Sequence, residues 1–341
     1  MGDTESRGAA IDADGVELTY SDGTEAVRGI DLEVPEGEFF GFLGPNGAGK
    51  TTTIKTFTTL LSPTGGTISV NGYDVVSEAQ QVRESIGYMA QETSVDLELT
   101  ARENVRFAAQ AYGVPREHRA DRIDELLDLV DLADVADKRA DEFSGGMKKR
   151  LDVATALVHD PPLVFLDEPT TGLDPKARNR LWDYFERINE QGTTLFLTTQ
   201  YLEEADALCD RLAVILDGEI VAEGSPMELK RRVGGEILDV DLDDPDERER
   251  AAEIAREAGV FDSDADVTVS DDGISVTAER AREHGTDLLV ALRDADVTVT
   301  GFNIRAPTLD DVFLSITGEK PDLDGDDGDD VTETTTEVRA E

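Results

Sequence analysis

Residues Gly44 to Thr51 constrain the fold of this chain more than any other feature of its sequence. They read Gly-Pro-Asn-Gly-Ala-Gly-Lys-Thr and fit the pattern G-x-x-x-x-G-K-[ST] in full. An apolar run, Phe39–Leu43, precedes them, and a helical pattern begins at Gly49. In such a loop, backbone N–H groups can close around phosphate groups, and the start of the helix adds a favourable field for anions. The pattern therefore predicts a phosphate-binding loop (P-loop) in an α/β fold.

Each position of this loop is a candidate for binding a nucleoside triphosphate. Lys50 is expected to reach the β- and γ-phosphates, and the Thr51 hydroxyl is expected to bind Mg²⁺. A chance glycine-rich turn is the alternative, which the strand before the loop and the helix after it disfavour. The candidate nucleotide-binding residues are Gly44, Pro45, Asn46, Gly47, Ala48, Gly49, Lys50, Thr51 and Thr52.

Two adjacent carboxylates, Asp167 and Glu168, end a second apolar run, Leu163–Leu166. Asp167 is placed to hold Mg²⁺, and Glu168 is placed to orient and deprotonate an attacking water. A solvated acidic loop is the alternative in so acidic a chain. The phosphate-binding loop favours the catalytic interpretation, with Lys50 and Glu168 as catalytic residues, and the two motifs together predict a P-loop nucleoside triphosphatase.

The charge balance limits the partners of the chain. It carries 76 acidic residues against 32 basic ones, a net charge of −44. This charge disfavours nucleic acid as a partner. The negatively charged side chains also repel one another unless salt screens the repulsion. At about 1 M salt the Debye length is only about 3 Å, so most of this repulsion is screened. We interpret the composition as an adaptation to molar salt in a halophile; a disordered acidic protein is the alternative, which the periodic apolar segments disfavour.

Cysteine usage and hydropathy indicate a cytosolic chain. The single cysteine, Cys209, excludes an internal disulfide and agrees with a reducing compartment. No apolar run approaches the roughly 20 residues that a membrane helix needs, and the N-terminus carries no secretory signal. Any role at a membrane would therefore need a partner that spans it.

The chain divides into segments of different pattern. From Val16 to about Val233, short apolar strands alternate with amphipathic helices, as is typical of an α/β fold. After Gly234 the pattern restarts in the order β-α-β-β-α-β, which suggests a small ferredoxin-like α+β domain. The predicted divisions are a flexible leader at 1–14, the α/β domain at 15–234 with a helical subdomain at about 92–160, the α+β domain at 235–318, and a disordered acidic tail at 319–341.

The run Phe143-Ser144-Gly145-Gly146-Met147 narrows the class of P-loop protein. Ser144 is a good N-cap, and the helix predicted from it to about His159 offers a second anion site; an ordinary helix cap is the alternative. With these motifs in this order, the chain from about Val16 to Gly318 resembles the ATP-binding subunits of ABC transporters. The resemblance implies that Ser144, Gly145 and Gly146 complete the ATP site of a second subunit.

The resemblance also implies roles for residues outside the motifs already described. Gln91 matches a glutamine that touches Mg²⁺ and senses the permease, and Asp174 matches a residue that crosses the dimer. Asp174 before Pro175 is also an ideal helix N-cap, and both roles can hold. Tyr20 matches an aromatic residue that stacks on adenine, with a core strand tyrosine as the alternative.

Gln200 marks a departure from the family pattern, which has a histidine at this position in contact with the γ-phosphate. We expect Gln200 to keep that contact through its amide N–H₂ group, with a solvated loop residue as the alternative. Subunits of the daunorubicin-resistance type resemble this segment with glutamine in place. The segment Ala306–Leu314 also looks like the ending of that subfamily, and the two features together favour an exporter.

The resemblance implies a subunit that binds ATP and Mg²⁺ and hydrolyses ATP to ADP and phosphate. It implies a homodimer joined through ATP, driving a transmembrane permease from the cytoplasmic face of the cell membrane. The cargo would be drug-like or lipid-like. The surviving alternative is a regulatory ATPase of ABC type whose C-terminal domain binds a ligand.

Overall fold

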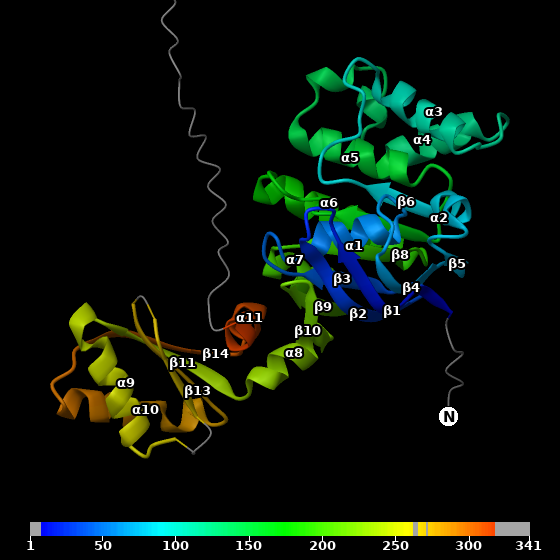
Figure 1. Cartoon of the computed structure of the whole chain (residues 1–341). Helices are drawn as coiled ribbons and strands as arrows, with labels where there is room; N and C mark the ends of the chain where they lie inside the picture. The colour runs from blue at the N-terminus through cyan, green and yellow to red at the C-terminus, as the bar shows by residue number, and fades with distance from the viewer. Residues whose placement is uncertain (1–7, 262–264, 271, 318–341) are drawn as a thin grey trace, which may run out of the picture.

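The structure is a computed structural model that describes residues 8–261, 265–270 and 272–317. The larger part of the molecule combines two sheets with a layer of helices, and the smaller part lies beside it (Figure 1). The predicted acidic tail at 319–341 and the first seven residues of the predicted leader lie outside the described residues.

A six-stranded sheet in the order β10-β9-β3-β8-β7-β6 forms the centre of the larger part. Strands β9, β3, β8, β7 and β6 are parallel, and β10 forms a hairpin with β9. Parallel strands end at the same edge of the sheet, so the residues that follow β3, β6, β7 and β8 gather there. The strands are β3 (Phe39–Leu43), β6 (Ile86–Met89), β7 (Leu163–Asp167), β8 (Thr194–Thr199), β9 (Arg211–Leu216) and β10 (Glu219–Gly224).

A second, antiparallel sheet in the order β2-β1-β4-β5 shows that the prediction of a flexible leader over 1–14 was wrong for Ala9 to Asp14. These residues belong to β1, where Ile11 and Ala13 are buried. The register shifts between Ala13 and Val16, so the alternation of apolar and acidic residues is interrupted where the strand continues. The strands are β1 (Ala9–Thr19), β2 (Glu25–Pro35), β4 (Gly65–Val70) and β5 (Tyr73–Asp74).

Three helices form a separate layer within the segment predicted to be helical (Figure 1). They are α3 (Ala101–Ala111), α4 (Arg119–Leu129) and α5 (Gly145–Ala156), with 3₁₀ turns at Ala133–Val135 and Ala140–Glu142. Helix α5 ends before His159, where we expected it to end. The other helices of the larger part are α1 (Lys50–Phe57), α2 (Ala79–Ser85), α6 (Pro175–Glu190), α7 (Leu202–Leu208) and α8 (Pro226–Val233).

The smaller part has the predicted β-α-β-β-α-β order. Its four strands form an antiparallel sheet in the order β12-β13-β11-β14, with a core of its own, and this is the ferredoxin-like arrangement. The elements are β11 (Glu236–Leu242), a 3₁₀ turn (Pro245–Glu247), α9 (Arg248–Glu257), β12 (Asp266–Val269), β13 (Gly273–Ala278), α10 (Ala281–Asp294) and β14 (Val299–Arg305).

The last helix, α11 (Leu309–Thr317), leaves this smaller part and packs on α7 and α8 of the larger one (Figure 1). Leu309, Val312 and Phe313 are buried in the same core as Leu202 of α7 and Leu229 of α8. The final helix of the predicted 235–318 domain is therefore part of the first domain's core. The sequence could not show this, because an amphipathic helix does not reveal which surface it covers.

Candidate functional site

The phosphate-binding loop joins β3 to α1 at the edge where the parallel strands end. Two of its glycines lie where no side chain fits. A Cβ atom on Gly44 would lie 2.4 Å from the carbonyl oxygen of Ile215, and one on Gly49 would lie 2.5 Å from that of Ala26. Gly49 also has a φ of 107°, which favours glycine. Backbone of both sheets, at Ile215 of β9 and Ala26 of β2, is therefore packed directly against the loop.

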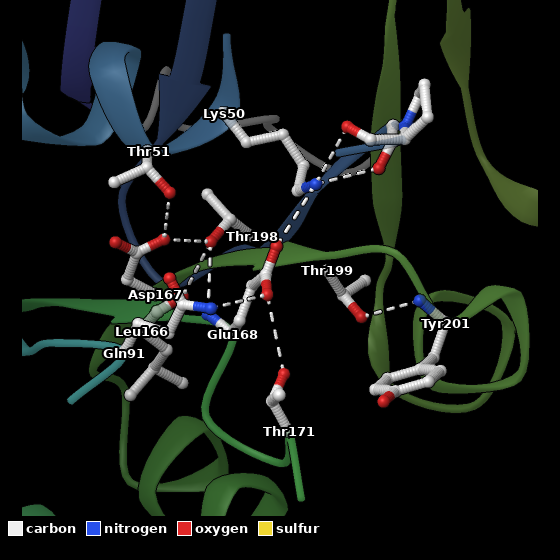
Figure 2. A network of polar contacts seen from close by, with 12 residues as sticks. Lys50, Thr51, Gln91, Leu166, Asp167, Glu168, Thr171, Thr198, Thr199 and Tyr201 are labelled. Carbon is white, nitrogen blue, oxygen red and sulfur yellow. Dashed lines mark hydrogen bonds and ion pairs between the residues drawn. The ribbon is translucent and has the colours of Figure 1, made fainter. Parts of the chain in front are cut away.

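Lys50, the first residue of α1, is only 4% exposed. Its ammonium donates hydrogen bonds to the carbonyls of Gly44 at 2.8 Å and Pro45 at 3.1 Å. It also lies 3.1 Å from Glu168 Oε1 (Figure 2). The structure therefore brings together the cation predicted to bind phosphate and the carboxylate predicted to act on water.

Asp167, the last residue of β7, is buried between two hydroxyls. Thr51 Oγ1 donates to Asp167 Oδ1 at 3.2 Å, and Thr198 Oγ1 donates to the same oxygen at 2.7 Å (Figure 2). Burial raises the pKa of Asp167, while the two hydroxyl hydrogen bonds lower it and the charge of Glu168 raises it. Tyr88 of β6 also contacts Asp167, and burial together with this carboxylate raises the pKa of the tyrosine.

Thr51 and Asp167 have the chemistry of a Mg²⁺ site. Mg²⁺ prefers oxygen ligands and is commonly bound by one or two carboxylates together with phosphate oxygens. Here a hydroxyl oxygen and a carboxylate oxygen lie 3.2 Å apart beside the phosphate-binding loop. A divalent cation would also offset the cost of burying Asp167 in its charged form. The residues present therefore fit Mg²⁺.

Glu168 follows Asp167 with a φ of 45°, a conformation that few residues other than glycine adopt. Its backbone N–H is held by Thr198, and its Oε2 accepts hydrogen bonds from Gln91 Nε2 at 3.2 Å and Thr171 Oγ1 at 3.4 Å. The left-handed backbone turns the chain sharply, and the side chain meets both Lys50 and Gln91. Strained backbone of this kind often marks functional sites.

Tyr20 and Gln200, the residues predicted to contact adenine and the γ-phosphate, lie close to the elements that carry the phosphate-binding loop and Asp167. Tyr20 is 40% exposed, and its hydroxyl lies 3.0 Å from Thr52 Oγ1, so its ring is next to α1. Gln200 is half-buried and directly follows β8, whose Thr198 is opposite Asp167 in the sheet. Gln200 thus lies at the edge where the phosphate-binding loop begins, and Tyr20 lies beside the helix that follows the loop.

The predicted second anion site lies on other elements. Ser144 caps α5 by accepting a hydrogen bond from the Met147 N–H at 3.3 Å, and Asp174 caps α6 in the same way from Ala177 at 2.9 Å. A pocket opens between these two helix starts. Three of its lining residues are basic and one is acidic; the lining is made of Ser144, Gly146, Met147, Arg150, Asp174, Lys176, Ala177 and Arg180.

Two features of the site were missed by sequence reasoning. The Thr198 hydroxyl donates a hydrogen bond to Asp167 and accepts one from the backbone N–H of Glu168, and the Thr171 hydroxyl donates to the Glu168 carboxylate. Thr198 stands at the end of β8, which pairs with β7. This position would have indicated a contact with Asp167 if the order of the strands had been known from the sequence. Cys209 is buried, and burial raises its pKa.

Comparison with known proteins agrees with this geometry. The family model for ABC transporter matches residues 27–171, and the model for ATP-binding protein DrrA1-3-like, C-terminal domain, matches residues 224–317. The daunorubicin/doxorubicin resistance ATP-binding protein DrrA of Streptomyces peucetius is 43% identical over 92% of this chain and 94% of its own length. The linearmycin resistance ATP-binding protein LnrL of Bacillus subtilis is 34% identical over 90% of this chain and 98% of its own.

A solved structure shares the architecture of the larger part. The structure of cbiO1 from Clostridium perfringens, part of an ABC transporter complex, aligns with a TM-score of 0.61 and 29% identity. It covers 66% of this chain and 94% of that one. Among the described residues, no helix is both long and apolar enough to cross a membrane.

Proposed function

Because this chain belongs to the ABC transporter family, as an ATP-binding subunit of the drug-resistance and export type, we propose that it hydrolyses ATP to drive a separate membrane permease. The observation that carries the proposal is the position of Glu168, next to Asp167 and in contact with both Lys50 and Gln91. A carboxylate held in this way beside a phosphate-binding loop is suited to act on water.

Binding of the triphosphate would redistribute the contacts of Lys50. The ammonium would exchange the carbonyls of Gly44 and Pro45, and its ion pair with Glu168, for phosphate oxygens. Glu168 would then be free to accept a proton from water while Gln91 holds its other oxygen. Tyr20 would stack on the adenine ring, next to Thr52.

Thr51 and Asp167 would hold Mg²⁺, which supplies positive charge to the phosphates when it is bound. Glu168 orients a water molecule and takes its proton as the water oxygen forms a bond to the γ-phosphorus. The bond from phosphorus to the bridging oxygen breaks, and ADP and phosphate result. Gln200 donates its amide N–H to the γ-phosphate. Most of the catalysis comes from positioning and from stabilising charge.

We further propose that two copies of the chain close on ATP. The N–H groups at the start of α5, from Ser144, Gly145 and Gly146, would face the phosphates of the partner's ATP, with Asp174 crossing the dimer. The pocket at this helix start has three basic residues, Arg150, Lys176 and Arg180, against one acidic residue. This local excess of positive charge supports the assignment, since the chain as a whole carries a net charge of −44. The dimer would lie at the cytoplasmic face of the cell membrane, beneath a transmembrane permease.

The cargo is proposed to be drug-like or lipid-like and to leave the cell. Support comes from relatives named for resistance to daunorubicin, doxorubicin and linearmycin, which match nearly the whole chain. These matches extend through the C-terminal part and favour a transport subunit over a regulatory ATPase. We also propose that the chain works in molar salt, because its charge would otherwise repel itself.

Glu168→Gln tests the proposed function. The amide cannot take the proton of water, so we expect ATP to bind without turnover and to hold the dimer closed. Size-exclusion chromatography with light scattering, with and without Mg-ATP in molar KCl, would show a dimer only with nucleotide. Glu186→Gln, on the exposed surface of α6, is the matched control and should turn over as the parent does. Wild-type turnover by Glu168→Gln would remove Glu168 from its role, and a variant that stays monomeric with Mg-ATP would refute the ATP-bridged dimer.

A further inference from the structure

Two charged side chains are buried on one face of α5, Lys149 at 8% exposed and Asp152 at 2%. They are three residues apart in the helix and therefore neighbours on its surface. A buried charge is costly unless hydrogen bonds and opposite charges compensate it. The partners of these two residues show what the buried charges hold in place.

Both side chains hold the segment that follows β6. The Lys149 ammonium donates to the Gln91 carbonyl at 2.5 Å. The Asp152 carboxylate accepts hydrogen bonds from Thr93 Oγ1 at 2.6 Å, from the Ser94 N–H at 3.0 Å and from Ser94 Oγ at 2.7 Å. Residues 91–94 are themselves exposed, so polar contacts with α5 rather than apolar burial fix their position.

The far end of the segment is tied to α3. Asn104 accepts a hydrogen bond from the Asp96 N–H at 2.9 Å and donates to the carbonyls of Asp96 and Thr100, each at 3.0 Å. The segment is thus attached to the helical layer at both ends. Its first residue, Gln91, is the one whose side chain reaches Glu168.

Lys149 also interacts electrostatically with the carboxylates of the candidate catalytic site, Asp167 and Glu168. Burial lowers the pKa of Lys149, while Asp152, Asp167 and Glu168 all raise it by attraction. For Asp152 the main effect is also burial, which raises its pKa against the hydrogen bonds from Thr93 and Ser94 and the attraction of Lys149.

We propose that Lys149 and Asp152 are positioning residues that fasten the Gln91 segment to helix α5, so that the amide of Gln91 meets Glu168 only when α5 is correctly placed. The inference deepens the proposed function, on which it rests. The helix that begins at Ser144 and faces the partner's ATP also carries, one turn further on, the anchor of Gln91.

Lys149→Met removes the donor and keeps a long side chain. At saturating Mg-ATP we expect kcat to fall by about 10- to 100-fold with KM within about twofold of the parent, because a small displacement of a positioning group can cost this much. Lys149→Arg keeps a donor and should recover most of the lost rate. The matched control is the neighbouring half-buried Lys148→Met, which should behave as the parent does.

Asp152→Asn gives a second measurement that does not depend on turnover. It keeps the volume of the side chain and removes its charge, so the Ser94 amide should exchange its hydrogen faster while the amides of the β7 strand do not change. Unaltered Ser94 exchange in Asp152→Asn, or parental kcat in a folded Lys149→Met, would overturn the proposal. A parent chain inert towards Mg-ATP would instead contradict the proposed function, and the exchange of Ser94 would still decide whether Asp152 anchors the segment.

Discussion

The type of residue at position 200, directly after β8, determines whether the site contains a titratable hydrogen-bond donor there. In this chain the residue is glutamine, whose amide does not titrate. The residue is half-buried and follows Thr199, in the strand whose Thr198 contacts Asp167. An amide N–H₂ group can donate a hydrogen bond to phosphate as a histidine ring does, and it carries no charge that changes with pH. Glutamine at this position therefore adds no pH dependence of its own to the site.

Gln200→Ala removes this donor. If the amide stabilises charge on the γ-phosphate, kcat should fall by about 10²–10³, by comparison with the loss of one oxyanion-hole donor, while ATP affinity changes far less. Steady-state ATPase rates at saturating Mg-ATP and a nucleotide-binding titration measure the two quantities. An alanine variant within about twofold of the parent rate would show that Gln200 is a solvated loop residue.

Gln200→His tests the same contact through pH. A histidine has an unperturbed pKa of about 6.5, and its protonated form places positive charge next to phosphate. The rate of the variant relative to the parent should therefore rise as pH falls through that range. A flat ratio from about pH 5.5 to about pH 8 would contradict contact between residue 200 and the γ-phosphate.

The sequence predicted those parts of the site whose residues lie next to one another in the chain. The run from Gly44 to Thr51 and the pair Asp167 and Glu168 form short motifs, and the structure brings both to one sheet edge. The contacts of Thr198 with Asp167 and of Lys149 with Gln91 depend on strand register and helix packing between distant segments. No local spacing encodes such contacts.

At the scale of elements, the prediction was good where the apolar pattern was uninterrupted. All five residues of β3 and of β7 are buried, and both strands were expected from continuous apolar runs. Strand β1 was only partly predicted, because Asp12 and Asp14 alternate with its buried residues and the register shifts after Ala13. A half-buried strand with acidic residues at alternate positions has the composition of a flexible leader, even when it pairs with a strand on each side, as β1 does with β2 and β4.

Helix α11 makes a prediction about stability. Phe313 is 6% exposed in the core that includes α7 and α8, so Phe313→Ala should lower the free energy of unfolding by about 3–5 kcal/mol. Ser315→Ala, on the exposed side of the same helix, should change it by less than about 0.5 kcal/mol. Urea unfolding in molar KCl, followed by circular dichroism, compares the two. Equal stability of both variants would mean that α11 does not complete this core in solution.

At the scale of the whole molecule, the net charge of −44 sets the conditions for folding. Acidic residues outnumber basic ones by 76 to 32, so the basic residues cannot offset all of the negative charge. Lowering the salt concentration lengthens the screening distance, and the self-repulsion of the folded chain grows.

Folding should therefore require high salt. Far-UV circular dichroism across a KCl series from about 0.05 M to about 3 M should show helical signal lost at the low end and gained with salt. A sucrose series of matched water activity, which adds no ions, serves as the control for excluded-solute effects. A signal that stays flat across the KCl series would refute the adaptation to molar salt and leave the transporter assignment intact.

The return of α11 to the first domain has a consequence for the order in which this protein can be built. A ribosome releases the chain from its N-terminus, and Leu309, Val312 and Phe313 are among the last residues of the described chain to emerge. Until they do, the apolar surfaces of α7 and α8 that α11 covers remain exposed. The whole ferredoxin-like domain must be synthesised before the hydrophobic core of the first domain can be completed by α11. A chain that stops before α11 would therefore contain every nucleotide-binding motif and still expose apolar surface of its core, and exposed apolar surface makes a protein prone to aggregation.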